Sequence, residues 1–267
     1  MSLVEPTWWE RYWARRRAGS RAREKYHQMR KHWLLRKRKV WWALAGGLLV
    51  LWLAFHVILS ATAPADSRVA GVWMWSSGFI AGTAVMTFIA VRMSPPGSVE
   101  RWQEGAYGEA ATAKELEKLP RGWEAMHDLR NGDYNFDHVV VGPPGVFLLN
   151  SKWSSFRLEP SGDGGLIGVQ VDDETVTMRI EPHVRQATRD ALDLKKVIEA
   201  RTGKRLWVQS VIVWWGAYPG GGQSVAKVAV VSGDVLVQRL LSQSGRHPTD
   251  VAAIADALRP GRHAAAR

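Results

Sequence analysis

Two long apolar segments near the start of the chain constrain its fold most strongly. Val40–Ser60 is an almost unbroken apolar run with His56 as its only ionisable residue, and Val69–Val91 carries no charge at all. Each reaches the roughly 20 residues that an α-helix needs to cross a bilayer core about 30 Å thick. The connector between them, Ala61–Arg68, is short. The two segments therefore predict a hairpin of two membrane-spanning helices.

Basic residues predict how this hairpin is oriented. Residues 1–40 contain thirteen Lys or Arg and three Glu, a net charge of +10, whereas the whole chain carries +11. Because basic segments beside a span stay in the cytoplasm, we expect a multi-pass cell-membrane protein with both termini cytoplasmic. Ala61–Thr62–Ala63 resembles a signal-peptidase site, and cleavage there is the rival interpretation. The apolar run before it is longer than a usual signal core, which favours a membrane anchor.

The basic N-terminal arm is also rich in tryptophan, with Trp8, Trp9, Trp13 and Trp33 placed among its arginines and lysines. Tryptophan favours the membrane interface, and basic residues beside a span attract anionic lipid head groups. We therefore expect the arm to contact anionic lipid. Contact with the backbone of a nucleic acid is the alternative for a basic, aromatic-rich segment.

The chain has no cysteine. This excludes disulfides, thiolate metal sites and a cysteine nucleophile. The sequence also has no Walker phosphate loop, no Rossmann glycine fingerprint and no G-x-S-x-G nucleophile elbow. These absences argue against the nucleotide-binding and serine-hydrolase classes that such motifs mark.

The remainder of the chain predicts one α/β domain. Its elements are expected at Trp102–Leu119 (helix), Trp123–Leu129, Phe136–Val141 and Val146–Lys152 (strands), Ser154–Glu181 (an extra hairpin and loop), Pro182–Ala200 (helix), Leu206–Trp215 and Ala226–Val231 (strands), and Asp234–Ser242 and Pro248–Leu258 (helices). This order fits a mixed sheet with helices against it. We divide the chain into a basic arm (1–39), a transmembrane hairpin (40–92), this domain (93–258) and a disordered tail (259–267).

Two apolar runs of this domain predict a β-hairpin. FDHVVVGP covers Phe136–Pro143, and GVFLLNSK covers Gly145–Lys152. If Gly142–Gly145 form a four-residue loop, Val141 faces Val146, and the register of the two strands is then set.

This register places polar residues together at the far end of the hairpin. Counting back from the loop puts Asp137 opposite Asn150, and alternation of side chains puts Lys152 on the same face as Asn150. A carboxylate, an amide and an ammonium on one patch can hold a metal ion and a water molecule. A salt bridge between Asp137 and Lys152 on a half-exposed sheet is the alternative.

Glu109 is a further candidate, because it falls on the inward stripe of the first helix. An unpaired carboxylate is costly to bury there; a partly exposed residue at the edge of the stripe is the alternative. Gly105 and Gly108 precede it and weaken the helix by about 1 kcal/mol each relative to Ala. Such glycines are expected where another backbone comes close. The stripe consists of Trp102, Ala106, Glu109, Ala113 and Leu116.

These stretches carry a family resemblance. GAYGEA at Gly105–Ala110, HDL at His127–Leu129, FDHVVVGPPGVFLLNSK, and EPHVRQA at Glu181–Ala187 resemble the NERD, or nuclease-related, domain. That family is similar to the PD-(D/E)XK restriction-endonuclease-like superfamily. The resemblance runs from Glu100 to Leu241 and implies a restriction-endonuclease-like mixed sheet flanked by helices.

The resemblance also implies a site and a chemistry. It implies Glu109, Asp137, Lys152 and Gln186 as catalytic residues, with Asn150 and Lys152 as a degenerate D/E-x-K pair. Mg²⁺ or Mn²⁺ would be held by Asp137, Asn150 and Glu109, and the substrate would be DNA or RNA. Gln186 lies beside the inner stripe of its helix, and a solvated side chain is its alternative.

Asn150 departs from the nuclease pattern, which usually has Asp or Glu at that position. The loss of one ligand charge predicts weaker metal binding. It also favours the alternative function, a catalytically inactive, membrane-tethered nucleic-acid-binding or scaffold module.

Overall fold

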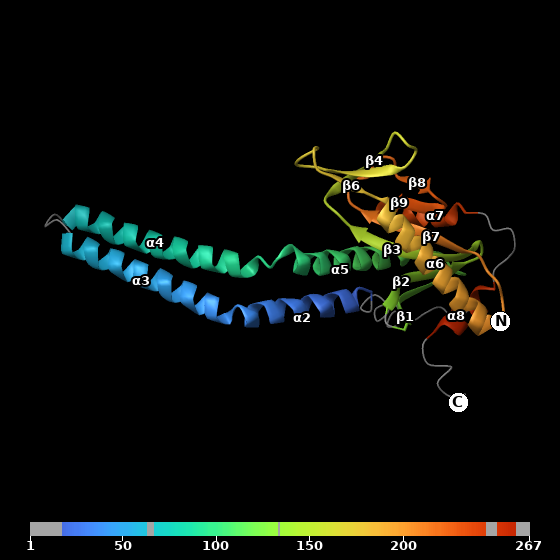
Figure 1. Cartoon of the computed structure of the whole chain (residues 1–267), viewed down its shortest axis with the longest axis horizontal. Coiled ribbons are helices and arrows are strands. Elements are labelled where there is room, and N and C mark those ends of the chain that lie inside the picture. Colours follow the sequence, from blue (N-terminus) through green and yellow to red (C-terminus); the bar gives the residue numbers. More distant parts are fainter. Residues whose placement is uncertain (1–17, 63–66, 133, 244–249, 260–267) are drawn as a thin grey trace, which may run out of the picture. The chain divides into compact units, whose positions relative to one another are not determined.

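The computed structural model describes residues 18–62, 67–132, 134–243 and 250–259 (Figure 1). Contacts divide the chain into two compact units. One spans Lys25–Arg101, and the other joins the residues up to Glu24 to those from Trp102 onward. The sheet-bearing unit therefore includes a short piece of the expected basic arm. Several expected features lie outside the described residues, namely Trp8, Trp9, Trp13, Ala63 and residues 260–267.

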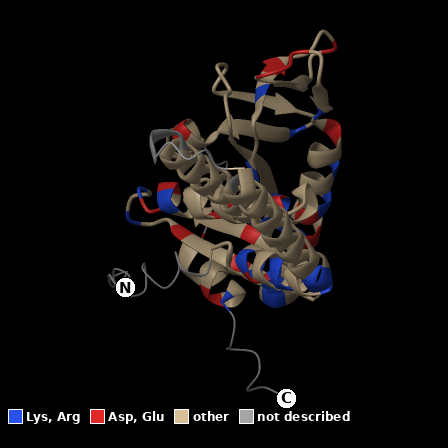
Figure 2. Cartoon of the chain, turned by 90° about the vertical axis from the view of Figure 1, so that its left-hand side faces the viewer, with Lys and Arg blue, Asp and Glu red and all other residues tan. Residues whose placement is uncertain are grey.

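The first of the two long apolar helices is α3 (Arg38–Thr62), and the second is α4 (Ser67–Met93). The segments Arg38–Thr62 and Ala70–Met93 are long enough and apolar enough to cross a membrane, with mean hydropathies of 2.1 and 1.5. Away from their ends the two helices carry no Lys, Arg, Asp or Glu (Figure 2).

Polar contacts join α3 to α4 across this hairpin. The indole of Trp52 donates to the backbone oxygen of Ser77 at 3.2 Å, and Nδ1 of His56 lies 3.1 Å from the Ser77 hydroxyl. Interhelical hydrogen bonds of this kind stabilise helix pairs in an apolar environment. His56 thus has a hydrogen-bonding partner in the neighbouring helix.

The sheet-bearing unit is built on a six-stranded mixed sheet in the order β1-β2-β3-β7-β9-β8. β1–β2, β2–β3 and β8–β9 are antiparallel, whereas β3–β7 and β7–β9 are parallel. The expected mixed α/β fold is confirmed. The strands are β1 (Glu124–Asn131), β2 (Tyr134–Gly142), β3 (Gly145–Trp153), β7 (Val208–Trp215), β8 (Gly222–Val225) and β9 (Val228–Ser232).

Helices pack on both faces of this sheet. On one face lie α6 (Glu181–Thr202) and α8 (Val251–Leu258), whose apolar residues cluster with alternate residues of β2 and β3. The other face is covered by α5 (Gly97–Leu116) and α7 (Leu236–Leu241), which follows the short 3₁₀ turn η1 (Gly233–Val235). The inner stripe of α6 is buried, in keeping with its spacing of three and four residues, and consists of Val184, Ala187, Ala191, Leu194 and Ile198.

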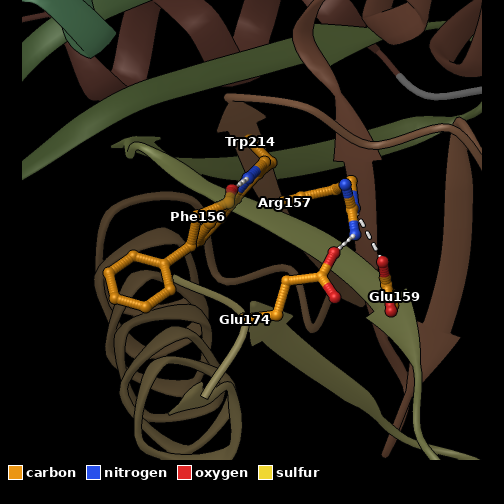
Figure 3. Close-up of polar contacts among 5 residues, drawn as sticks. All are labelled: Phe156, Arg157, Glu159, Glu174 and Trp214. Atoms are coloured by element: carbon orange, nitrogen blue, oxygen red, sulfur yellow. Dashed lines mark hydrogen bonds and ion pairs between the residues drawn. The ribbon is translucent and has the colours of Figure 1, made fainter. Parts of the chain in front are cut away.

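The expected hairpin between β3 and α6 is a three-stranded antiparallel sheet of β4 (Phe156–Pro160), β5 (Leu166–Gln170) and β6 (Thr177–Arg179). The indole of Trp214 donates to the Phe156 carbonyl at 3.1 Å and ties this small sheet to the central one (Figure 3). Arg157 pairs with Glu159 at 2.6 Å and with Glu174 at 3.2 Å.

The structure adds one strand to those expected and moves the start of one helix. Gly222 begins β8, which pairs with β9 at the edge of the sheet. The glycine-rich composition hides this strand because glycine lowers strand propensity. The first helix begins at Gly97 rather than Trp102, directly after Pro96, whose carbonyl accepts the N–H of Val99.

Candidate functional site

The site begins at the β2–β3 hairpin, whose register is the predicted one. Val141 pairs with Val146, and Gly142 pairs with Gly145, so Pro143 and Pro144 form the tip of the loop. The paired residues continue to His138 and Leu149. The next pair in this register is Asp137 and Asn150, as counting from the loop predicts.

Asp137 is partly buried and accepts a hydrogen bond from the backbone N–H of Ser151. Burial raises the pKa of its carboxyl group to about 6, against the opposing effects of the Lys152 charge and the Ser151 hydrogen bond. The described residues form no ion pair between Asp137 and Lys152. The alternative of a salt bridge between Asp137 and Lys152 is therefore not supported by a direct contact. The Lys152 ammonium nevertheless acts on the Asp137 carboxyl group through its charge.

Asn150 is nearly buried, with 7% of its surface exposed. Its Nδ2 atom has no hydrogen-bond partner among the described residues. A buried amide group without a partner costs free energy unless a ligand or water satisfies it. Rotation of the amide by 180° exchanges its oxygen and its nitrogen. The unpaired atom of Asn150 can therefore serve either as an oxygen ligand to a cation or as an N–H donor.

Glu109 reaches the same cluster from α5. Burial is the main cause that raises the pKa of its carboxyl group to about 8, and the negative charges of Asp137 and Asp128 add to it. The backbone N–H of Gly19 and the charge of Lys152 oppose this shift. The charges of Asp137 and Asp128 thus act on the carboxyl group of Glu109.

A close backbone approach explains where Glu109 lies. A Cβ added to Gly108 would meet the backbone nitrogen of Trp153 at 3.2 Å. A Cβ added to Gly105 would have no atom of a neighbouring element within 4 Å. The expected reason for a glycine is therefore confirmed at Gly108 and wrong at Gly105.

Hydrogen bonds hold α5 against β3 beside this approach. The Thr112 hydroxyl bonds to the Ser151 hydroxyl at 2.6 Å, and it accepts the indole N–H of Trp215 at 2.7 Å. Ser151 separates Asn150 from Lys152, and its side chain points to the opposite face from theirs. One face of β3 thus anchors the helix, while the other presents the candidate site.

A cavity of about 360 Å³ opens beside the hairpin. Asp137, Asn150 and Gln186 line it, so the structure brings these three predicted residues together. Lys152 and Glu109 are not part of its lining, and they join the site through their charges on Asp137 and on each other. The full lining is Tyr134, Asn135, Asp137, Asn150, Gln186, Arg189, Asp190 and Asp193.

Sequence reasoning missed three acidic residues of this region, Asp128, Asp190 and Asp193. Asp190 lies four residues after Gln186 and lines the same cavity. Burial raises the pKa of the Asp190 carboxyl group, and the nearby charge of Lys152 opposes this shift. The four-residue spacing on one helix face was an available signal. Asp128 lies between the pairs His127–His138 and Leu129–Phe136, in a left-handed conformation with φ of 55°. Its position opposite Asp137 depends on the β1–β2 register, which the sequence pattern does not specify.

The donor set fits a hard cation held by few protein ligands. The described residues contain no cluster of three or more His, Cys, Asp or Glu placed to hold a metal ion. The available oxygens are the carboxylates of Asp137 and Glu109, the side-chain oxygen of Asn150 and the carbonyl of Ser151. Mg²⁺ is usually bound through one or two carboxylates and keeps several waters, so such a set fits a weak magnesium site.

Comparison with known families identifies the central part of the chain. Residues 104–215 match the family model of NERD, the nuclease-related domain. The expected resemblance is confirmed over this range, which contains all five predicted site residues. No curated protein and no solved structure matches the chain.

Proposed function

We propose that this chain is a membrane-anchored, divalent-metal-dependent nuclease that hydrolyses phosphodiester bonds of nucleic acid. The NERD match supports a nuclease-related function. The observation that carries the proposal is the β2–β3 register, which is paired as far as His138 and Leu149. Continued by one residue it aligns Asp137 with Asn150, and alternation along β3 puts Lys152 on the same face as Asn150. The proposal is supported by the cavity beside this hairpin, which Asp137 and Asn150 line.

The chain's own residues have distinct roles in this proposal. Asp137 and Glu109 would hold Mg²⁺ or Mn²⁺, with neutral oxygens from Asn150 and Ser151. The bound cation would polarise the phosphoryl oxygen and activate a water molecule. Lys152 would orient the attacking water and stabilise the negative charge that develops on the phosphate. Gln186, which is exposed and lines the cavity, would donate a hydrogen bond to the substrate phosphate or the water.

The electrostatics of the cluster support a functional role. Perturbed pKa values concentrate at functional sites, and both Glu109 and Asp137 have raised ones. Adjacent carboxylates that repel each other gain from a cation between them. We therefore expect cation affinity to rise as the pH rises through the pKa values of these two groups.

The membrane anchor belongs to the same proposal. The length and composition of α3 and α4 suit two membrane spans. We propose that both termini are cytoplasmic and that the basic arm contacts anionic lipid head groups. The substrate nucleic acid would then be cleaved at the cytoplasmic face of the membrane.

Asn150 favours a second function, binding of nucleic acid without cleavage. A neutral amide supplies less ligand charge than the usual carboxylate, and its unpartnered Nδ2 can donate to a phosphate oxygen. In this alternative, the domain is a membrane-tethered binding or scaffold module.

Cleavage by the full-length protein in lipid nanodiscs tests the first function against the second. DNA and RNA are incubated with Mg²⁺, with Mn²⁺ or with a chelator. We expect cleavage only with metal, and its loss in Asp137→Asn and Lys152→Ala at an unchanged melting temperature. Asp172→Asn and Lys204→Ala, at exposed positions remote from the hairpin in sequence, serve as matched controls. Metal-independent cleavage, or full activity in both site variants, would contradict the proposal.

A further inference from the structure

A short N-terminal segment packs onto the candidate site. This segment, Ala18–Arg21, which we call the strap, precedes the family match and leads into α2 (Ser20–Arg36). Ala18 is fully buried, and Gly19 is buried in a left-handed conformation with φ of 68°. A Cβ added at Gly19 would lie 3.0 Å from the backbone oxygen of Ala106. The strap therefore lies directly against the backbone of α5, one helical turn before Glu109.

The strap donates hydrogen bonds to two acidic residues of the site. The backbone N–H of Gly19 donates to the carboxylate of Glu109. The hydroxyl of Ser20 donates to Oδ2 of Asp128 at 2.6 Å. These donors lie at the start of α2, where the free N–H groups and the helix dipole favour negative charge.

A closed hydrogen-bond network extends from the strap to the cavity. Asn135 donates to Oδ1 of Asp128 at 3.1 Å, and its own side-chain oxygen accepts from Nη1 of Arg21 at 3.1 Å. Asp128 is thus held from both sides, by Ser20 and by Asn135. Asn135 also lines the cavity beside Asp137, so the network ends at the wall of the site.

The strap supports this wall and does not fill the cavity. None of its residues is part of the cavity lining, which includes Asp137, Asn150 and Gln186. An inhibitory plug would instead occupy that space. The contacts are made to Glu109, a proposed cation ligand, and to Asp128, and supporting hydrogen bonds of this kind orient a metal site.

We propose that the strap is a positioning element of the site, in which Gly19 and Ser20 fix the carboxylates of Glu109 and Asp128 for cation binding. This inference rests on the proposed function. The complete site is then formed by two parts of the chain, because the strap lies before the apolar helices and the hairpin lies after them. A fragment that starts after α4 lacks the strap and should bind the cation weakly.

The test uses the full-length protein in nanodiscs, with Mn²⁺ alone as the probe. Ser20→Ala removes the donor to Asp128, and Ser20→Thr keeps a hydroxyl. Gly19→Ala introduces the crowding against Ala106. We expect about tenfold weaker Mn²⁺ binding in Ser20→Ala and Gly19→Ala, as is typical when supporting hydrogen bonds of a metal site are lost. We expect rescue in Ser20→Thr.

Two controls separate positioning from loss of stability. Gly203→Ala introduces the same strain at φ of 68°, but with no atom within 4 Å of the new Cβ. Ser242→Ala removes an exposed helix-end hydroxyl that donates to the backbone oxygen of Arg239. Both should bind Mn²⁺ as the parent does. Hydrogen exchange should also rise at residues 105–110 and 126–130 in Gly19→Ala and not in Gly203→Ala.

The outcomes are distinguishable. A parent that binds Mn²⁺ and strap variants that bind equally well, or more tightly, would overturn the positioning role alone. Tighter binding would identify the strap as an inhibitory cap. A parent and variants that all fail to bind Mn²⁺ would overturn the metal site and, with it, the positioning role.

Discussion

The backbone of Gly108 lies against that of Trp153, and a Cβ at Gly108 would be 3.2 Å from the Trp153 nitrogen. Contacts this short are tighter than ordinary van der Waals packing. Because Trp153 follows Lys152 in β3 and Gly108 precedes Glu109 in α5, this single approach sets the relative position of two candidate site residues.

Alanine substitutions at the two glycines of α5 should have opposite consequences. Gly105→Ala has open space and should stabilise the helix by about 1 kcal/mol through propensity alone. Gly108→Ala should destabilise the protein, because the added Cβ crowds the Trp153 backbone and α5 must move away from β3. We expect a higher melting temperature for Gly105→Ala, and both a lower one and weaker Mn²⁺ binding for Gly108→Ala. Equal melting temperatures would show that the approach is not tight in solution.

The raised pKa of Glu109 predicts how stability depends on pH. Its pKa in the folded protein is about 8, against an ordinary value of 4.5. Between these two values the folded state binds more protons than the unfolded state, so stability falls as the pH rises through this window. The pKa of Asp137, raised to about 6, adds to the same trend. Burial lowers the pKa values of His127 and His138, which opposes this trend below their ordinary value of 6.5. In a chelator, the melting temperature should therefore decline from pH 6.5 to pH 8.

Glu109→Gln should flatten this decline, because the amide cannot ionise. Glu104→Gln, an exposed position on the same helix, is the matched control and should keep the parent's slope. Thermal unfolding at several pH values measures both. A parent that is equally stable at pH 6.5 and pH 8, or a Glu109→Gln variant with an unchanged slope, would contradict the burial of this carboxyl group.

The hairpin could be predicted from sequence because its determinants are local. Loop length and side-chain alternation together fix the register, so the positions of Asp137 and Asn150 follow from a count. The buried stripe of α6 follows in the same way from helical spacing. Gly108 stands out because a glycine in a helix has an energetic cost that calls for a reason.

The remaining features depend on contacts between distant parts of the chain. Ser20 meets Asp128 across 108 residues, and no periodic pattern signals such a pair. Asp128 reaches the site through the register of β1 and β2, which extend beyond the expected ends at Leu129 and Phe136 to Asn131 and Tyr134. β8 is a four-residue edge strand that begins in a glycine run and gains its strand character from pairing with β9. In each case tertiary contacts decide the structure, so local propensity does not predict it.

Membrane topology is a separate prediction. The thirteen basic residues of segment 1–40 should hold both ends of the chain in the cytoplasm. Reporter fusions at the N-terminus and the C-terminus, read in intact cells, measure this directly. Replacing the basic residues that flank the first span by Gln should weaken the preference. A mature protein that begins at Pro64, or either terminus outside the cell, would refute a retained hairpin.

Asn150→Asp decides between the two proposed functions. If Asp137 and Glu109 hold a cation, a third carboxylate at position 150 adds ligand charge, and Lys152 remains to balance it. Mg²⁺ and Mn²⁺ should then bind more tightly, and the melting temperature should rise more with metal than it does in the parent, because a ligand that binds only the folded state stabilises it. Without metal, the new carboxylate opposite Asp137 should lower the melting temperature, since like charges facing each other across a sheet are destabilising.

Thermal unfolding of parent and variant, with metal and with a chelator, separates these effects. Asp137→Asn in the Asn150→Asp background is the control, because it restores the original number of carboxylates and should remove the extra metal response. A variant that is less stable under both conditions, with no metal response in either form, would leave the binding or scaffold module as the function of this domain.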